Sequence, residues 1–237
     1  MTYVDGFVIP VPHDKRQAYL EMAKAVTPLF KQHGAIECVE TWGDDLKKGH
    51  TTDFYMAVDA EEGENVVLSW MVWPDKETRD AAHPKVMADP LFESMNNDIF
   101  NGKRMFWGGF VPMLDDGTKG PAGYVDGFII AVPTANKEAY RRQAEGGSPI
   151  FRDLGCTRIV ECWGDDVPHG TLTDFYRAVK AEEGESIVFS WMEYPDKASR
   201  DKANADMMSD PRFEALGDMP FDGKRMIYSG FTPILQA

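Results

Sequence analysis

The sequence predicts an α+β protein built from two fused copies of one ferredoxin-like unit. The first observation is a repeat, because Tyr3-Val4-Asp5-Gly6-Phe7 returns as Tyr124-Val125-Asp126-Gly127-Phe128. The second is that Trp42-Gly43-Asp44-Asp45 returns as Trp163-Gly164-Asp165-Asp166 at the same shift of 121 residues (163 minus 42). The third is the order of patterns within a copy, β-α-β-β-β-α-β. A chain of 237 residues therefore holds two small domains, and not the shorter repeats of a solenoid.

The first two elements of a copy are a strand and a helix. Residues 3–11 form a β-branched and aromatic run that a proline ends, which is typical of a strand. Asp14 can cap a helix, because apolar residues recur after it at helical spacing up to Phe30. Pro28 lacks an amide donor and predicts a break or a kink, with Thr27 capping a second short helix that ends at Gly34.

Three further strands and a loop are expected in the middle of the copy. Residues 35–42 alternate as a strand, and residues 43–49 form a loop rich in turn residues. Within it, Trp-Gly-Asp-Asp predicts a turn in which Gly43 adopts a positive φ and the aspartates are exposed. Residues 53–58 predict a short third strand, and residues 66–73 a fourth.

The copy ends with a helix and a strand. Asp75 is expected to cap a helix that runs to about Ala88 and to form an ion pair with Arg79 one turn later. Asp89-Pro90 stops this helix and opens a short helical turn. A loop from Asn96 to Lys103 then leads to the last strand, residues 104–113.

These elements define unit 1 as residues 1–114, a linker at residues 115–123, and unit 2 as residues 124–237. The order is a split βαβ arrangement with one added short strand. Such a unit has an antiparallel sheet with both helices on one face. Two fused copies can therefore bury their remaining sheet faces against each other.

Composition excludes several classes of function. The formal net charge of −14 predicts a soluble protein that repels nucleic acid and anionic membranes. The amino terminus has no basic region or apolar core typical of a signal peptide, and no long apolar run predicts a membrane span. None of the three cysteines is repeated between the copies, which argues against a disulfide framework. The expected location is the cytoplasm.

No metal site or cofactor is expected. None of the five histidines has a histidine at its repeat position, so no histidine site can exist twice. The clustered cysteines and histidines of zinc sites and the glycine-rich loops of nucleotide sites are also absent. A lone haem ligand in one copy stays open, with His83 as its candidate. The favoured interpretation of His83 is a partly exposed helix residue.

Several motifs resemble one protein family. Beside the two repeated motifs above, Ser190-Trp191-Met192 and the run Met219-Pro220-Phe221-Asp222-Gly223-Lys224-Arg225-Met226-Ile227-Tyr228 are similar to the YbaA-like family of uncharacterised bacterial proteins. This family lies within the dimeric α+β barrel superfamily. The resemblance covers both units nearly end to end and is closer in unit 2. It implies that the two ferredoxin-like units pair as a single-chain pseudo-dimeric α+β barrel, and it implies no established function.

Carboxylates on the predicted strands are the candidate catalytic groups. Strand alternation puts Tyr3, Asp5 and Phe7 on one face and puts Asp53 beside Tyr55. A carboxylate that faces a barrel interior costs free energy unless it is paired or does chemistry. The candidates are Asp5, Asp53, Asp126 and Asp174, and the repeated cations that could pair with them in a purely structural role are Arg79/Arg200, Lys103/Lys224 and Arg104/Arg225.

Aromatic residues that occur in both copies, and two positions where only unit 2 is charged, are the candidate ligand-binding residues. Glu40 and Trp42 share a face of the second strand, as do their mates. Arg177 and Glu193 stand where unit 1 has Met56 and Val72, so they could form one ion pair or make one cavity polar. The candidates are Tyr3, Trp42, Tyr55, Trp70, Tyr124, Trp163, Tyr176, Arg177, Trp191 and Glu193.

Three functions follow from these residues and the resemblance. The first is binding of a small, partly apolar metabolite in a pocket lined by the barrel. The second is a cofactor-independent monooxygenase, isomerase or lyase that uses a strand carboxylate as general acid or base, by analogy with the superfamily. The third is a structural or interaction subunit without a small-molecule site, in which pseudo-dimers associate further through a sheet edge.

Overall fold

Eight antiparallel strands close into one barrel in the computed structural model, which describes residues 1–93 and 98–237. Their order around the barrel is β1-β3-β2-β8-β5-β7-β6-β4. The strands of the first half are β1 Tyr3–Pro12, β2 Glu37–Asp45, β3 Glu64–Trp73 and β4 Phe106–Gly117. Those of the second half are β5 Tyr124–Pro133, β6 Arg158–Asp166, β7 Glu185–Tyr194 and β8 Ile227–Gln236. Each half thus contributes four neighbouring strands in the order 4-1-3-2.

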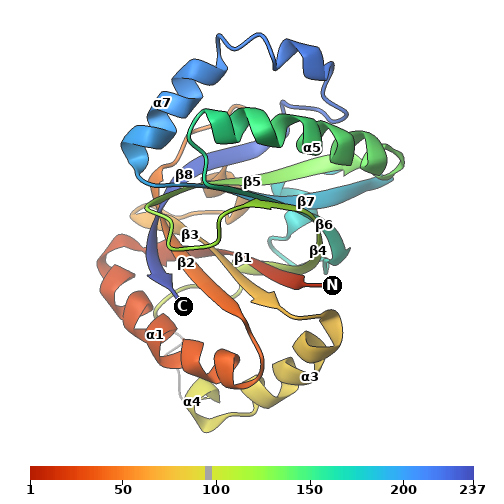
Figure 1. Cartoon of the computed structure of the whole chain (residues 1–237). Helices are drawn as coiled ribbons and strands as arrows, with labels where there is room; N and C mark the ends of the chain where they lie inside the picture. Colours follow the sequence, from red (N-terminus) through yellow and green to blue (C-terminus); the bar gives the residue numbers. More distant parts are fainter. Residues whose placement is uncertain (94–97) are drawn as a thin grey trace.

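The long helices pack outside the barrel, on its two sides (Figure 1). In the first half these are α1 Arg16–Gln32, α3 Lys76–Met87 and the short α4 Pro90–Glu93. In the second half they are α5 Lys137–Asp153 and α7 Lys197–Met207. Single 3-10 turns lie at His13–Lys15, Thr134–Asn136 and Glu214–Leu216. Each half therefore has one sheet face under its helices and the other toward the barrel interior.

Two seams join the halves, and both consist of antiparallel strand pairs. β2 pairs with β8, with Trp42 opposite Thr232, and β4 pairs with β6, with Val111 opposite Trp163. The backbone ladder continues around the whole barrel, so no strand has a free edge. β4 extends to Gly117, three residues into the expected linker, because its end pairs with Arg158 at the start of β6.

Side chains fill the barrel interior. Val4, Leu68, Trp70, Phe110 and Phe189 belong to one continuous buried cluster contributed by both halves. The expectation that Asp5 and Glu40 face the barrel interior is therefore wrong, because they alternate with these residues and lie on the outer face, under the helices. A candidate site can therefore lie between a sheet and its helices, or at an end of the barrel.

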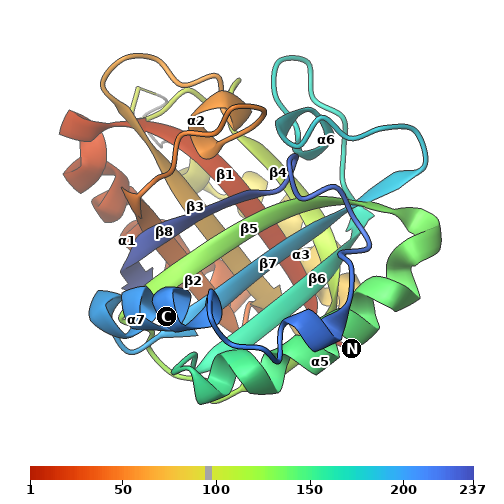
Figure 2. The same ribbon diagram turned by 90° about the horizontal axis from the view of Figure 1, so that it is seen from above.

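The predicted third strand is a one-turn helix in both copies, α2 Phe54–Ala57 and α6 Phe175–Ala178. Its aromatic and small residues, including Phe54 and Phe175, are buried in the barrel core. Figure 2 shows α2 and α6 together at one end of the barrel. A run of apolar residues this short does not distinguish a strand from a buried helical turn, and here the helical turns close the barrel end.

The predicted break at Pro28 is also wrong, because α1 continues through it to Gln32. Thr27 does not cap a new helix; its hydroxyl donates to the Ala23 carbonyl at 2.7 Å. Leu29 and Phe30 are buried, so the helix that carries them through the proline keeps its packing against the sheet. Gly34 ends the segment with φ 108°, as predicted.

Two expected polar features are different in the structure. Trp-Gly-Asp-Asp lies in strand β2, and Gly43 has no positive φ among the described residues. Asp75 caps α3 as predicted and accepts from the Thr78 amide at 2.7 Å, but Arg79 forms its ion pairs elsewhere. The predicted loop Asn96–Lys103 lies partly outside the described residues.

Candidate functional site

Asp5 lies at the centre of a buried polar cluster between β1 and α3. Its carboxylate is fully buried and accepts from Arg79 Nε at 2.8 Å and from Trp73 Nε1 at 2.9 Å. Asp126 accepts from Arg200 Nε at 2.7 Å in the same way, and burial raises its pKa while Arg200 opposes the shift. The expected pairing of these strand carboxylates with Arg79 and Arg200 is therefore confirmed.

The same arginines connect the two halves of the chain. Arg79 Nη1 reaches Asp166 at 2.9 Å, and Arg200 Nη1 reaches Asp45 at 2.8 Å. Next to each arginine, the hydroxyl of Tyr3 donates to Asp165 and that of Tyr124 donates to Asp44, both at 2.9 Å. We name these two networks the unit-joining clusters. They explain without any catalysis why Tyr3, Asp5, Arg79 and the Gly-Asp-Asp motif occur twice.

His83 distinguishes the unit-joining cluster of unit 1 from that of unit 2. Its Nε2 lies 2.9 Å from Asp5 Oδ2, and its ring meets Trp107 edge to face at 6.0 Å. In unit 2 the mate Asn204 lies 3.5 Å from Asp126. This contact could not be predicted from the repeat, because His83 occurs in one copy only.

The other two carboxylate candidates cap short helices. Asp53 accepts from the Met56 amide at 2.7 Å and from the Gly49 amide at 3.0 Å. Asp174 makes the same two bonds, to the amides of Arg177 and Gly170. Tyr55 and Tyr176 follow these aspartates and pack, half-buried, against the barrel core.

A second carboxyl lies in both halves between β2 or β6 and the long helix above it, buried in Glu161 and partly buried in Glu40. Tyr19 on α1 donates to Glu40 Oε2 at 2.7 Å, and Tyr140 on α5 donates to Glu161 Oε2 at 2.8 Å. Strand register places Ser69 opposite Glu40 and Ser190 opposite Glu161, and each serine acts to lower the pKa of the carboxyl opposite it. We name these the Tyr–Glu–Ser clusters.

The electrostatics of these clusters differ from those of the unit-joining clusters. Neither glutamate forms an ion pair in the part of the chain that the structure describes. Burial therefore dominates and raises the pKa of Glu40 and of Glu161 to about 7, against smaller opposing effects of the tyrosine and serine hydrogen bonds. A carboxyl of this kind can both take up and release a proton near neutral pH.

Apolar side chains surround each Tyr–Glu–Ser cluster, and several are only partly buried. In unit 1 these are Phe7, Met22, Phe100 and Met105, next to buried Trp42. In unit 2 they are Phe128, Ala144, Phe221 and Met226, next to buried Trp163. Trp42 and Trp163 also lie under the side chains of Arg16 and Lys137, at 5.5 and 5.1 Å.

Three of the remaining ligand-binding candidates lie together, and Arg177 lies apart from them. Trp70 and Trp191 stack inside the barrel, with ring centroids 4.5 Å apart. Glu193 lies next to Trp191 at one end of the barrel, where its carboxylate forms an ion pair with Arg158 at 3.2 Å. Arg177 is exposed and pairs with Asp174. Arg177 and Glu193 thus do not form the single ion pair that the sequence left open.

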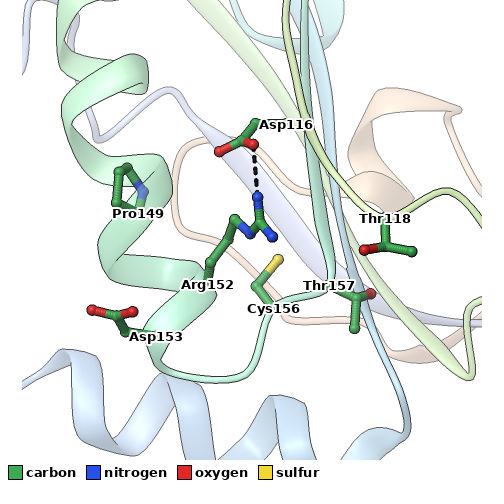
Figure 3. A pocket seen from close by; sticks show the side chains of 7 residues that line it. All are labelled: Asp116, Thr118, Pro149, Arg152, Asp153, Cys156 and Thr157. Atoms are coloured by element: carbon green, nitrogen blue, oxygen red, sulfur yellow. Dashed lines mark hydrogen bonds and ion pairs between the residues drawn. The ribbon is translucent and has the colours of Figure 1, made fainter.

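Two cavities stand out in the described residues, and only one contains sequence candidates. The larger, about 530 Å³, is a polar surface groove beside the end of α5 (Figure 3). Arg152 spans it to Asp116 at 2.8 Å, and burial raises the pKa of its Cys156 to about 12, so that thiol stays protonated. The smaller, about 270 Å³, is lined by Trp70 and Glu193 among other residues.

Within residues 1–93 and 98–237, no group of three or more His, Cys, Asp or Glu residues is placed to hold a metal ion.

No helix in the described residues is both long enough and apolar enough to cross a membrane.

Comparison with known proteins supports the internal repeat. The family model described as "Protein of unknown function (DUF1428)" matches residues 2–102 and again residues 123–223. The chain is 60% identical over 113 residues to YbaA, an uncharacterized protein of Escherichia coli K12, which covers 47% of this chain and 97% of YbaA.

Solved structures of similar fold are distant in sequence. An anthrone oxidase-like protein matches with a TM-score of 0.65 and 12% identity, over 100% of this chain and 92% of that one. A candidate monooxygenase from Lactobacillus acidophilus NCFM matches with a TM-score of 0.61 and 12% identity, over 100% and 95%. At such identities the likeness concerns the fold alone.

Proposed function

Because the chain belongs to the DUF1428 family, whose model it matches twice, we propose that it binds a small, partly apolar carbonyl compound and moves a proton on it. The proposed sites are the Tyr–Glu–Ser clusters, one under the long helix of each ferredoxin-like unit. The observation that carries the proposal is a carboxyl under the long helix of each half, buried in Glu161 and partly buried in Glu40, which a tyrosine hydroxyl bonds and which has no ion pair in the described residues.

The chemistry needs no external oxidant. In its ionised form, the Glu40 carboxylate takes a proton from a carbon next to a carbonyl, which leaves an enolate. The protonated carboxyl then returns a proton to carbon or to oxygen, so that the net reaction is an isomerisation. A carboxyl with a pKa of about 7 suits both steps.

The surrounding side chains suit an apolar substrate. Phe7, Met22, Phe100 and Met105 provide flexible and aromatic surface beside Glu40, and methionine adapts to irregular ligands. The likeness in fold to an anthrone oxidase-like protein suggests anthrone as a probe, since anthrone is an aromatic ketone with acidic C–H bonds.

The test is exchange of the methylene hydrogens of anthrone for deuterium, followed by NMR under nitrogen in D₂O. We expect the protein to accelerate exchange above the buffer rate, and the double variant Glu40→Gln/Glu161→Gln to lose at least nine-tenths of the acceleration. Glu62→Gln, which changes an exposed glutamate, serves as the control and should exchange at the wild-type rate. Acceleration that is equal in the folded double variant would contradict the proposal.

A further inference from the structure

A cavity of about 270 Å³ lies at the end of the barrel opposite α2 and α6, where the linker passes the ends of strands from both halves. Trp70 lines it from inside the barrel, and Val39, Val125 and the linker residues Pro121 and Ala122 form apolar walls. Glu37 and Glu193 supply carboxylates to the same lining. We name this space the axial cavity.

Three differences in charge between the two copies meet beside the axial cavity. Glu37 of unit 1 corresponds to Arg158 of unit 2, and Val72 corresponds to Glu193. Asp115 at the end of β4 corresponds to Gln236. These substitutions meet at one place, because each lies at the same end of its strand and the barrel brings those ends together.

The charges at this end do not balance. Buried Arg158 contacts Glu37 at 3.1 Å, Glu193 at 3.2 Å and Asp115 at 2.8 Å. One guanidinium thus faces three carboxylates, and the only other cation contacting them among the described residues is exposed Lys119, 3.3 Å from Asp115. The cavity therefore has a negative potential beside an aromatic and aliphatic wall.

Glu193 has a free acceptor in this lining. Its Oε1 accepts from Trp191 Nε1 at 3.0 Å and from Arg158 at 3.2 Å. Its Oε2 accepts no hydrogen bond within the described part of the chain, although the residue is only 3% exposed. A carboxylate oxygen that lines a cavity and accepts from no protein donor is available to a ligand N–H.

We propose that the axial cavity binds a small organic ammonium ion, with its N–H donating to Glu193 Oε2 and its hydrocarbon part against Trp70, Val39 and Val125. The carboxylate provides a charge-assisted hydrogen bond. The aromatic and aliphatic walls exclude water from it, which strengthens the electrostatic attraction. This site is separate from the Tyr–Glu–Ser clusters, which lie on the outer face of the sheets.

The test uses n-butylammonium chloride as the probe and 1-butanol as its neutral counterpart of similar shape. Binding is followed by NMR of the indole N–H signals, with those of Trp70 and Trp191 assigned from Trp→Phe variants. We expect the ammonium ion to shift these two signals saturably and to bind at least ten times more tightly than the alcohol. Equal affinity of the two probes, or shifts confined to other tryptophans, would overturn the proposal.

The key variant is Glu193→Gln, with Glu62→Gln at the opposite barrel end as the matched control. Glu193→Gln should weaken binding of butylammonium at least tenfold, and Glu62→Gln should leave it unchanged. Unchanged affinity in folded Glu193→Gln would overturn the proposal. If that variant does not fold, the affinity of the wild-type protein for butylammonium is measured at rising NaCl concentration. We expect this affinity to fall, because salt screens the attraction between the two charges. An affinity that does not depend on salt would overturn the proposal.

Discussion

At the scale of single residues, two kinds of carboxyl between sheet and helix have different environments. Asp5 and Asp126 each accept from an arginine, which gives them a structural role in joining the two halves. Glu40 and Glu161 each accept from a tyrosine hydroxyl and form no ion pair among the described residues, so burial decides their pKa. A carboxyl of this second kind can exchange protons near neutral pH.

This difference predicts how stability depends on pH. The pKa of Glu161 is about 7 in the folded chain, above its ordinary value of 4.5. Between these values the folded state holds a proton that the unfolded state has released. The stabilising contribution is therefore complete below about pH 4.5 and is lost as pH rises through 7, by at most roughly 1.4 kcal/mol per pH unit. Urea unfolding from pH 5 to 8 should show a shallower decline for Glu161→Gln than for the wild type; parallel curves would contradict the assignment.

A second residue-scale prediction separates capping from catalysis at Asp53. Its two carboxylate oxygens accept from two different amides, so Asp53→Ala should be about 1 kcal/mol less stable. Asp53→Asn keeps the helix cap and loses only the bond from the Gly49 amide, so it should lose clearly less. The free energy of unfolding in urea measures both. A loss in Asp53→Asn as large as in Asp53→Ala would show that the charge, and not the cap, matters.

At the scale of elements, the sequence predicted most strands and helices, and the wrong predictions concern features that long-range contacts decide. The caps at Asp75 and Gly34 depend on neighbouring residues, and they were predicted correctly. Trp-Gly-Asp-Asp looked like a turn because the partners of its aspartates, such as Arg200 for Asp45, lie 155 residues away in the sequence. The Tyr–Glu–Ser clusters join three elements through long-range contacts, so strand alternation could place Glu40 beside Trp42 but could not find Tyr19.

Alternation also could not tell which sheet face is inside the barrel. Both faces of each sheet are buried, one by the other half and one by helices, so both carry apolar residues. Charged residues such as Asp5 were therefore assigned to the wrong side.

At the scale of the whole molecule, the two halves fit across the barrel through glycines of the repeated first strand. A Cβ on Gly127 of β5 would lie 2.1 Å from Leu68 Cδ2 of β3. The close approach explains why Tyr-Val-Asp-Gly-Phe needs its glycine, and it makes the packing of one half depend on the other.

This contact predicts a non-additive pair of substitutions. Gly127→Ala should cost about 1–3 kcal/mol through overpacking, and much less in a Leu68→Ala background, where the clashing methyl is gone. A double-mutant cycle of unfolding free energies measures the coupling. Strictly additive losses would show that the halves do not meet at this point.

The central claim is that Glu40 and Glu161 hold and release protons near neutral pH. Its most direct test is a pH titration of the side-chain carboxyl carbons by NMR of ¹³C-labelled protein, with Glu40→Gln and Glu161→Gln assigning the two signals. We predict midpoints near pH 7 for both groups. Midpoints at or below 4.5, the ordinary value for glutamate, would contradict the claim.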